Sequence, residues 1–305
     1  MRIFVNKITK KTKEICNNPY KIIYLPGISR MCTLLGDAKY IKLMFRALTG
    51  SKLNLNNPTT FNEKLQWLKL YDRRSIYTEM VDKFKVKRFV ANIIGEDYII
   101  PTLGVWDKFD EIDLSKLPDR FVLKTTHDSG GIVICRNKSN FDTKIAKKKI
   151  NRSLRRNYYF SGREWPYKGV QPRIIAEKYM ADKSEGLNDY KVYNFNGEPR
   201  LIQVDFDRFS NHKRNIYTTK WEYVPVEIEY PTDPNHVIEK PAVLEEMLEL
   251  SRKLARDIPF LRTDFYIVKG KIYFGELTLY HGNGTEHIVP NSFNVEMGEW
   301  LELPR

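Results

Sequence analysis

The sequence predicts an α+β fold in which antiparallel strand pairs are interleaved with helices. Two hairpins carry most of this prediction. Residues 189–207 form one apolar-rich hairpin around the Asn-Gly pair at 196–197, which is typical of a tight type I′ turn. Residues 262–278 hold two β-branched and aromatic runs around a Lys-Gly pair, and an amphipathic helix over 241–257 precedes them. Because tight hairpins pair strands antiparallel, a doubly wound parallel sheet is excluded.

The N-terminal quarter of the chain is predicted to be basic and mainly helical. Residues 38–48 fit an amphipathic helix that a glycine ends. Thr60 and Glu63 fit a capping box that opens a further helix. A basic helix is also expected over 1–17, so residues 1–75 are expected to form a helical N-terminal region. Apolar residues recur with helical spacing at Ile41, Met44, Phe45 and Leu48.

Strands and helices alternate through the middle of the chain. One continuous helix is predicted over 76–94, ending at a glycine, and a strand follows within 98–106. Residues 121–136 read as a strand, a Gly-rich loop and a second strand. A very basic helix over 141–157 precedes another strand within 173–180. No internal repeat or low-complexity segment interrupts this order.

Charge restricts the class of partner. The formal net charge is +13, and residues 1–50 hold ten Lys and Arg against only Glu14 and Asp37. A basic patch of this kind attracts nucleic acid, an anionic membrane surface or an anionic polymer, and a solvated basic surface is the alternative. No zinc-finger spacing, RNA-binding strand motif or recognition-helix signature accompanies the charge, so a nucleic-acid partner is not expected.

Apolar content and cysteine usage point to a reduced, cytoplasmic protein. Hydrophobic residues make up 42% of the chain, but no apolar run approaches the roughly 18 residues of a membrane span. The charged N-terminus lacks a secretory signal. Cys16, Cys32 and Cys135 are odd in number and scattered, which disfavours a disulfide framework and a Cys-x-x-Cys metal site.

The Gly-rich loop is the first candidate for chemistry. Lys124 ends an apolar strand, and Ser129, Gly130 and Gly131 lead into the next one. Small residues let backbone N–H groups approach an anion, and a lysine supplies a point charge to a phosphate oxygen. The loop is not a Walker A motif, because no helix begins after it. A hairpin with an ordinary glycine loop is the alternative interpretation.

Further polar residues precede and follow this loop. Asp82 and Lys83 fall inside the predicted helix 76–94, where a solvent-facing lysine is the simplest interpretation. Glu177 lies in a strand that offers backbone groups to an adenine edge, and Asp189, further along, can take two ribose hydroxyls. An ordinary strand with a polar exit is again the alternative.

The C-terminal hairpin raises a question of register. Arg262 and Asp264 share one face of their strand, and Glu276 and Thr278 share one face of theirs. A two-residue turn would put the two pairs on opposite sides of the hairpin. A three-residue loop with Gly270 in the left-handed region would pair 262 with 276 and bring all four together.

Two converging carboxylates need a compensating charge. At about 4 Å separation they repel by roughly 4 kcal/mol at an effective dielectric of 20. A shared proton, Arg262 or a divalent cation would offset this repulsion. Oxygen ligands beside a nucleotide favour Mg²⁺. A surface-facing hairpin edge with scattered charge is the alternative.

Taken together and in this order, these elements resemble the ATP-grasp superfamily of carboxylate–amine ligases. The resemblance covers about residues 76–285, and its strength lies in the order of the pieces, since no single piece is specific. The stretches T-F-N-E-K-L-Q-W-L-K-L and D-F-D-R-F further resemble the TupA-like branch, named for teichuronopeptide synthesis. The resemblance implies an ATP-grasp domain over 76–305, with a mobile small subdomain at about 119–178.

The resemblance also implies roles at the nucleotide. Lys83 and Lys124 would contact ATP phosphates, and Glu177 would meet the adenine amino group. Asp189 would hold the ribose. The remaining nucleotide-binding residues expected from the family pattern are Ser129, Gly130 and Gly131 in the flap over the phosphates, Lys178 and Met180 through their backbones, and Lys191.

At the reacting end the family pattern implies a metal site. Asp264 and Glu276 would ligate Mg²⁺, as two ions with Glu276 bridging them, and Arg262 would steady the phosphorylated intermediate. The family commonly has Asn two residues after the bridging Glu. Here that residue is Thr278, a weaker ligand, so either Thr278 or nearby Asn283 would complete the set.

The implied reaction is an ATP-dependent ligation. ATP phosphorylates a carboxylate, and an amine attacks the resulting acyl phosphate, from which the loop excludes water. Arg208, His212 and Arg214 would orient an anionic substrate. The branch suggests an amino acid or amine joined to a sugar acid, in capsule or cell-wall polymer synthesis at the cytoplasmic face of the membrane.

Three rival functions remain open. Asp205, Phe206 and Asp207 fit the D-x-D pattern of a glycosyltransferase, although a strand ending in this sequence explains it equally. A kinase would stop at phosphoryl transfer. A catalytically silent nucleotide- or polymer-binding module is the third, and intact Lys124 and Glu276 disfavour it.

Overall fold

The computed structural model describes residues 19, 34–180, 189–206 and 211–304. The basic helix predicted over 1–17, and the residues Asp207 and Arg208, lie outside this part of the chain. Within it, no helix is both long and apolar enough to cross a membrane.

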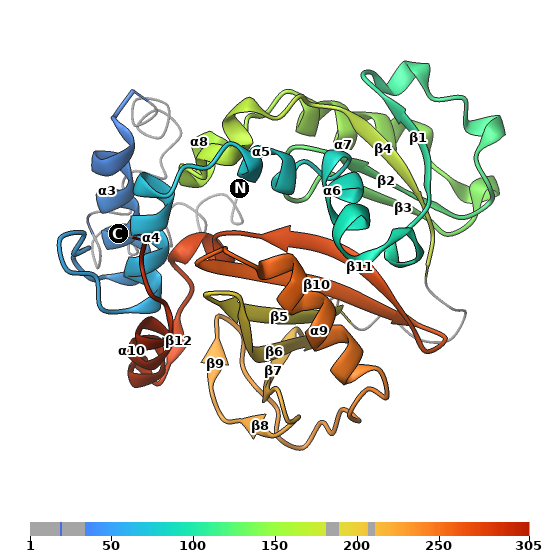
Figure 1. Cartoon of the computed structure of the whole chain (residues 1–305). Helices are drawn as coiled ribbons and strands as arrows, with labels where there is room; N and C mark the ends of the chain where they lie inside the picture. The colour runs from blue at the N-terminus through green and yellow to red at the C-terminus, as the bar shows by residue number, and fades with distance from the viewer. Residues whose placement is uncertain (1–18, 20–33, 181–188, 207–210, 305) are drawn as a thin grey trace, which may run out of the picture.

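Two antiparallel sheets confirm the α+β prediction (Figure 1). In the four-stranded sheet the spatial order is β1 (Thr102–Trp106), β4 (Ile174–Lys178), β2 (Phe121–Thr125) and β3 (Ile132–Cys135). In the six-stranded sheet it is β11 (Lys271–Thr278), β10 (Phe260–Val268), β5 (Asp189–Phe195), β6 (Glu198–Phe206), β7 (Lys213–Thr218) and β8 (Tyr223–Val224). The short strands β9 (Glu227–Ile228) and β12 (Ile288–Val289) form a separate pair.

Helices pack around both sheets. In Figure 1 the helix α7 (Thr143–Leu154) lies with the four-stranded sheet and α9 (Leu244–Ala255) with the six-stranded sheet. The others are α3 (Asp37–Thr49), α4 (Phe61–Tyr71), α5 (Ile76–Val81), α6 (Lys85–Ile94), α8 (Tyr159–Gly162) and α10 (Asn291–Trp300). Short 3₁₀ turns include η6 (Trp165–Gly169) and η7 (His281–Gly284).

The predicted helix signals of the N-terminal region are confirmed. Gly50 follows α3 in the left-handed conformation, with φ 75°, and its N–H bonds to Arg46 O. Thr60 and Glu63 form the capping box of α4. One face of α4 is buried in the same core as the six-stranded sheet, through side chains such as Phe61 and Leu65. The helix is therefore packed on that sheet.

The single helix predicted over 76–94 is wrong, because the chain leaves the helix between α5 and α6. Asp82 has an extended backbone, and its Oδ1 accepts hydrogen bonds from the N–H groups of Phe84 (2.9 Å) and Lys85 (3.2 Å). This carboxylate starts α6 as an N-cap does. Lys83 lies at the break, where its N–H donates to Thr126 O at 3.0 Å. The break ties the helices to the Gly-rich loop.

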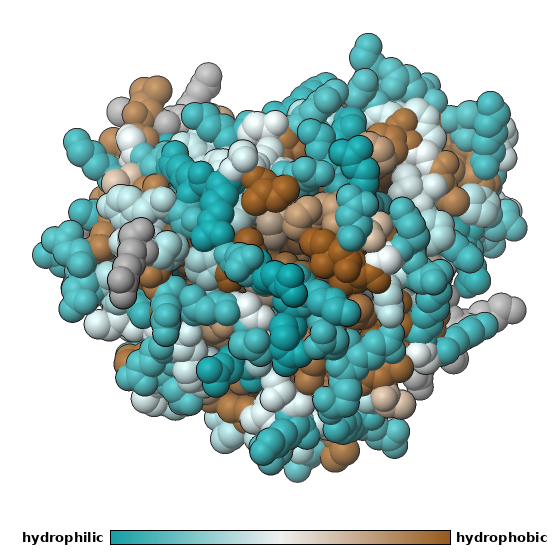
Figure 2. Space-filling model, viewed as in Figure 1, coloured by the Kyte–Doolittle hydropathy of each residue, from teal (hydrophilic) through white to brown (hydrophobic). Residues whose placement is uncertain are grey.

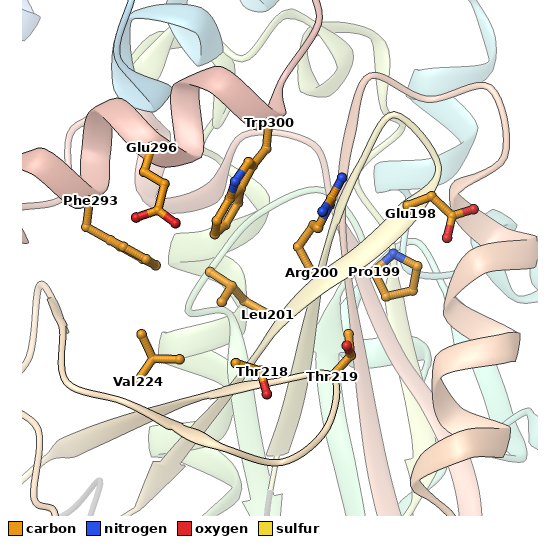
Figure 3. Close-up of a pocket in the computed structure, with 10 residues that line it drawn as sticks. All are labelled: Glu198, Pro199, Arg200, Leu201, Thr218, Thr219, Val224, Phe293, Glu296 and Trp300. Carbon is orange, nitrogen blue, oxygen red and sulfur yellow. The ribbon is translucent and has the colours of Figure 1, made fainter.

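The surface between α6 and α9 is hollowed and apolar. Figure 2 shows hydrophobic side chains gathered near the middle of this face. The groove here is lined by apolar and charged side chains, which are Ile76, Met80, Phe89, Ile93, Leu254 and Ile258 together with Arg74, Lys253, Arg256 and Asp257. A second groove, between α10 and the N-terminal end of β6, is shown in Figure 3 and is lined in part by Arg200, Glu296 and Trp300. This second groove lies at the opposite end of β6 from Asp205.

Candidate active site between the two sheets

The register of the β10–β11 hairpin differs from the predicted one. The connection is a two-residue turn of Lys269 and Gly270, with φ 53° and 76°, so the predicted three-residue loop is wrong. Asp264 nevertheless pairs directly with Glu276, because a β-bulge shifts the register between Asp264 and Phe265. The extra residue on β11 is Gly275.

The bulge brings the polar pairs to one face. Asp264 opposes Glu276 and Arg262 opposes Thr278, so all four side chains project from the same side of the hairpin. A Cβ on Gly275 would lie 3.0 Å from Asp264 O, so the absence of a side chain lets the strands approach here. The convergence expected from the sequence is therefore present, but its cause is the bulge in place of the turn.

Arg262 holds the Asp264 carboxylate in a two-point ion pair. Its Nε lies 2.7 Å from Oδ1 and its Nη2 lies 2.7 Å from Oδ2. Burial raises the pKa of Asp264 to about 6, against the lowering effect of Arg262 and Lys191. Burial likewise lowers the pKa of Arg262, but Asp264 more than reverses this and the net shift is upward. One charge of the site is thus already balanced within the hairpin.

Lys83 joins the two halves of the site. Its Nζ lies 2.9 Å from Glu276 Oε1 in the six-stranded sheet and 2.9 Å from Asp128 O in the Gly-rich loop. Burial works against both charges, but the pair holds the pKa of Glu276 below and that of Lys83 above its usual value. The Glu276 side chain keeps 38% of its surface exposed, so the carboxylate still reaches solvent.

A second lysine pair surrounds Glu177 on the four-stranded sheet. Lys124 Nζ lies 2.6 Å from Oε2, and Lys87 Nζ lies 2.5 Å from Oε1. Burial opposes the charged carboxylate, but the two lysines hold the pKa of Glu177 below its usual value. The group of three carries a net charge of +1. Lys87 was not expected at the site from the sequence. Its position four residues after Lys83, about one helical turn, was the signal that could have indicated it.

Buried hydrogen bonds anchor the Gly-rich loop. The Asp128 carboxylate accepts from the hydroxyls of Thr125 and Ser153. Gly131 leaves room for this cluster, since a Cβ there would lie 1.9 Å from Thr125 Oγ1. Ser129 and Gly130 are exposed at the tip. The loop is therefore fixed at its base and open at its tip.

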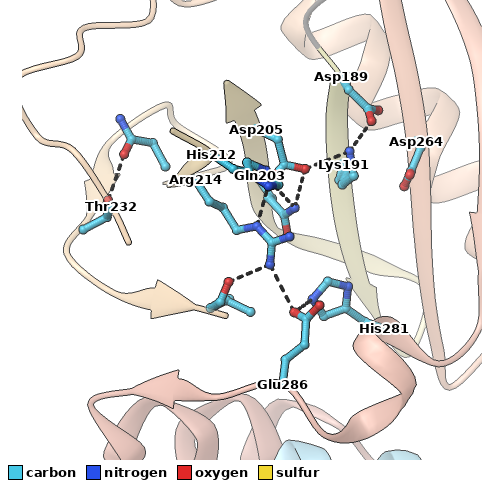
Figure 4. Close-up of polar contacts among 12 residues, drawn as sticks. Asp189, Lys191, Gln203, Asp205, His212, Arg214, Thr232, Asp264, His281 and Glu286 are labelled. Atoms are coloured by element: carbon cyan, nitrogen blue, oxygen red, sulfur yellow. Dashed lines mark hydrogen bonds and ion pairs between the residues drawn. The ribbon is translucent and has the colours of Figure 1, made fainter. Parts of the chain in front are cut away.

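The residues predicted at the ribose and substrate form one buried polar network (Figure 4). Lys191 contacts Asp189, and its Nζ lies 3.2 Å from Asp205 Oδ2. Arg214 Nε lies 2.8 Å from Asp205 Oδ1, and His212 Nε2 lies 3.3 Å from the same oxygen. The structure thus brings Asp189, Lys191, His212 and Arg214 together around Asp205.

His281 and Glu286 connect this network to the hairpin. Arg262 donates to His281 Nδ1 at 2.8 Å, which places the ring proton on Nε2. His281 Nε2 lies 2.7 Å from Glu286 Oε2, and the same carboxylate oxygen lies 3.1 Å from Arg214 Nη1. These two residues were missed by the sequence analysis, because only the fold of η7 brings them next to β10.

The site residues described above lie within one match to a protein-family model. Residues 63–302 match the TupA-like ATP-grasp family model. The chain belongs to the TupA-like ATP-grasp family. The matched region covers both sheets and most of α4, so it begins earlier than the resemblance seen in the sequence at about residue 76. A search of curated proteins found no match.

Solved structures of ATP-grasp proteins are similar at low identity. The D-alanine–D-alanine ligase of Bacillus anthracis, complexed with ATP, is 17% identical with a TM-score of 0.38, over 66% of this chain and 54% of that one. The chain thus spans about half of that ligase. The Helicobacter pylori ligase is 14% identical (TM-score 0.41, 79% and 69% covered). N5-carboxyaminoimidazole ribonucleotide synthetase, as an ADP complex, is 12% identical (TM-score 0.43, 77% and 56% covered).

The oxygen ligands expected in this ATP-grasp protein fit a magnesium ion that is also bound by nucleotide. Asp264 and Glu276 face each other on paired strands. The part of the chain that the structure describes contains no cluster of three or more His, Cys, Asp or Glu able to hold a metal. Asn283 Oδ1 accepts from Lys69, and Thr278 lies opposite Arg262. Two carboxylates with phosphate oxygens and water are therefore the ligand set available.

The strand expected to contact the adenine is β4. Glu177 and Lys178 are the last residues of β4, and Met180 follows, half-buried. The N–H of Lys178 donates to Pro101 O at 3.1 Å, so this backbone donor is already used. Nucleotide contact by Lys178 and Met180 stays a prediction.

Proposed function

We propose that this protein is an ATP- and Mg²⁺-dependent carboxylate–amine ligase that works through an acyl phosphate. The observation that carries the proposal is the contact of Lys83 with both Glu276 and the Gly-rich loop. It joins the Gly-rich loop that follows Lys124 to a carboxylate of the six-stranded sheet. Phosphates need the first of these, and a metal that binds phosphate needs the second.

The residues on each side have distinct tasks in this proposal. Lys83 and Lys124 bind ATP phosphates, under the flap of Ser129, Gly130 and Gly131. Asp264 and Glu276 hold Mg²⁺, which when bound neutralises charge on the phosphates. Arg262, held by Asp264, steadies the phosphorylated intermediate. These roles rest on the geometry above together with the family assignment.

The described aspartate of the glycosyltransferase motif, Asp205, is buried and is engaged by Lys191, Arg214 and Gln203. A D-x-D aspartate must turn a carboxylate oxygen toward a metal. Asp264 is buried and ion-paired as well, but it lies opposite Glu276, whose side chain is 38% exposed. The β10–β11 pair is therefore favoured over Asp205 as the metal site.

Calorimetry with a non-hydrolysable ATP analogue tests the nucleotide site. We expect binding that requires Mg²⁺ and is lost in the Lys124→Ala and Glu276→Ala variants. Glu296→Ala, in the groove of Figure 3, is the matched control and should bind as the wild type does. Tight binding of a sugar nucleotide with no binding of the analogue would reverse the proposal.

A substrate screen tests the reaction class. Amino acids and amines are paired with sugar acids such as glucuronate and galacturonate, and ADP release is followed. We expect ADP only when a carboxylate and an amine are both present. Turnover with one substrate alone, giving a stable phosphorylated product, would instead identify a kinase.

The substrate class that we propose is a sugar acid joined to an amino acid or amine in capsule or cell-wall polymer synthesis. Support comes from the family and from the basic surface. Residues 1–50, with ten basic side chains, would suit work beside an anionic polymer or at the cytoplasmic face of the membrane. Arg208, His212 and Arg214 are proposed to orient the anionic substrate.

A further inference from the structure

A buried carboxylate with no partner lies in the segment between α7 and β4. Glu164 is 6% exposed, and it follows Arg163, whose φ of 56° turns the chain between α8 and η6. Among the described residues, none forms a hydrogen bond or ion pair with its side chain, although Lys69 lies near enough to interact electrostatically. Carboxylates this buried are normally paired or hydrogen-bonded, so this one requires an explanation.

Hydrogen bonds tie the chain just before Glu164 to the reacting end of the site: Lys69 donates to Gly162 O and to Asn283 O in η7, and His281 of the same turn accepts from Arg262. Lys69 from α4, Arg262 from β10 and Glu276 from β11 all act on this carboxylate. Burial, aided by Glu276, raises the pKa of Glu164 to about 7, against the lowering effect of Lys69 and Arg262. Burial, aided by the charge of Glu164, raises the pKa of Tyr158, Tyr167 and Tyr280, so all three lie within electrostatic range of this carboxylate.

The Lys69 ammonium forms hydrogen bonds with groups other than Glu164. Its buried ammonium donates to Asn283 O at 2.7 Å, to Asn283 Oδ1 and to Gly162 O at 3.2 Å. These three bonds use all three donors of the ammonium. Lys69 therefore fastens the turn η7 to α8, and it leaves the Glu164 carboxylate without a direct cation.

Two neighbouring polar groups are also poorly satisfied. The Trp165 indole N–H and the Tyr280 hydroxyl are buried and lie close to each other, but neither makes a hydrogen bond of good geometry within the described chain. Tyr280 is the second residue after Thr278 on the chain that leaves β11, and Glu164 lies near it. Buried polar groups without well-formed partners, gathered at one place, mark where another polar molecule binds.

We infer that Glu164 binds the acceptor amine and receives its proton as the new C–N bond forms. This inference rests on the proposed ligase function and names the chemistry of the second substrate: a primary amine, bound as a cation. A carboxylate supplies the charge opposite to that of an ammonium group, and the rings of Tyr158 and Tyr167, packed edge to face with centroids 4.9 Å apart, form an aromatic wall near it.

The step balances within the proposed reaction. The ammonium first gives up one proton to solvent water, and the amine lone pair then attacks the carbonyl carbon of the acyl phosphate. A second proton passes from the attacking nitrogen to a Glu164 carboxylate oxygen. The bond between the carbonyl carbon and the phosphate oxygen breaks, and phosphate leaves with that electron pair. A group with a pKa near neutrality is effective as such an acceptor.

Hydroxylamine separates this step from the one before it. As a weakly basic nucleophile, it is neutral at pH 7.5 and traps an acyl phosphate as a hydroxamate without needing a base or a cation site. The assay supplies ATP, Mg²⁺ and each sugar acid or amino acid in turn. In Glu164→Gln we expect hydroxamate formation within twofold of the wild type. We expect amide formation with the amine panel to fall at least 100-fold.

The outcomes distinguish the two proposals. A wild type that makes no hydroxamate with any carboxylate overturns the proposed function. A wild type that makes hydroxamate, together with a Glu164→Gln variant that forms amide at the normal rate or loses both products, overturns the role of Glu164. Should Glu164→Gln unfold, Glu164→Asp replaces it, with hydroxamate formation kept and amide formation reduced about tenfold. Glu296→Gln is the control for removal of a carboxylate.

Discussion

Two hairpins of this protein lie on opposite sides of the candidate site. One carries most of its site residues in its loop, and the other carries them on its strands. In β2–β3 the strands pair in simple register, from Phe121 with Cys135 to Lys124 with Ile132, and the six-residue loop between them carries the predicted phosphate contacts. In β10–β11 the turn is a minimal Lys-Gly pair, and the strands themselves carry the charges.

The two hairpins depart from regular strand pairing at different places, and the function proposed for each explains where. A flexible contact to phosphates requires a loop that can move over its ligand, so β2–β3 concentrates its glycines there. A metal site requires fixed carboxylates, so β10–β11 places them on paired strands. Strand alternation alone would send Asp264 and Glu276 to opposite faces across a two-residue turn. One bulge residue, Gly275, corrects this.

Loss of the Glu276 carboxylate should have the largest effect. In Glu276→Gln the Lys83 ion pair and a metal ligand both disappear. We expect ATP-dependent turnover to fall by about 10²- to 10³-fold, measured as ADP release. Thermal unfolding serves as the control for folding. A variant with normal turnover would show that the β10–β11 wall does not take part in the reaction.

Substitution of Gly275 should disturb the site through the bulge. In Gly275→Val the new Cβ would lie 3.0 Å from Asp264 O, so the strands must move apart, and we expect Mg²⁺-dependent binding of an ATP analogue to weaken at least tenfold, by about 1.4 kcal/mol or more. Deletion of Gly275 instead leaves Asp264 opposite Glu276 in a regular ladder, so that variant should keep its binding. Loss of binding on deletion would show that the bulge has a role besides register.

The free energy of unfolding of the wild type should fall at low pH, because Glu286 becomes protonated. Burial opposes its charge, but His281 and Arg214 hold the pKa of Glu286 at about 2, below an ordinary value of 4.5. A lowered pKa stabilises the folded state above pH 4.5, and this contribution is lost as pH falls from 4.5 to 2. Urea unfolding across this range should show a loss of about 3 kcal/mol that Glu286→Gln lacks. Equal pH dependence in both proteins would contradict the assignment.

Gly131→Ala should destabilise the base of the Gly-rich loop. The new methyl group would lie 1.9 Å from Thr125 Oγ1 and 2.4 Å from Ser153 Oγ, so the buried Asp128 cluster must shift. We expect a cost of about 1–3 kcal/mol in urea unfolding. Gly169→Ala is the matched control, because a Cβ there would have only Thr78 Cγ2 at 4.0 Å, and its effect should stay below about 0.5 kcal/mol.

The smallest effect is expected at the turn of β10–β11. Lys269 has φ 53°, a conformation that asparagine adopts more readily. Lys269→Asn should stabilise the protein by about 0.5 kcal/mol and leave ADP release unchanged. A loss of activity in this variant would mean that the turn, like the loop of β2–β3, contacts a substrate.

The sequence by itself determined the elements and the chemistry of the predicted nucleotide site. Alternating strands, the Asn-Gly turn at 196–197 and the capping box at Thr60 and Glu63 are local signals, and the structure confirms each of them. The order of Lys124, Glu177, Asp264 and Glu276 indicated an ATP-grasp protein before any contact was known. Local residue type and spacing are sufficient for such features because backbone conformation is set within a few residues.

Only the tertiary structure decided which residues meet. The break at Asp82 depends on Arg173, 2.9 Å away and distant in sequence, and it turns Lys83 from a surface residue into the link between two sheets. A bulge is invisible to periodicity, because the residue that causes it looks like any strand glycine. Glu164 gave no local signal at all. Glu164 stands out because its carboxylate is buried without a hydrogen-bond partner among the described residues, and burial is a property of the packed molecule.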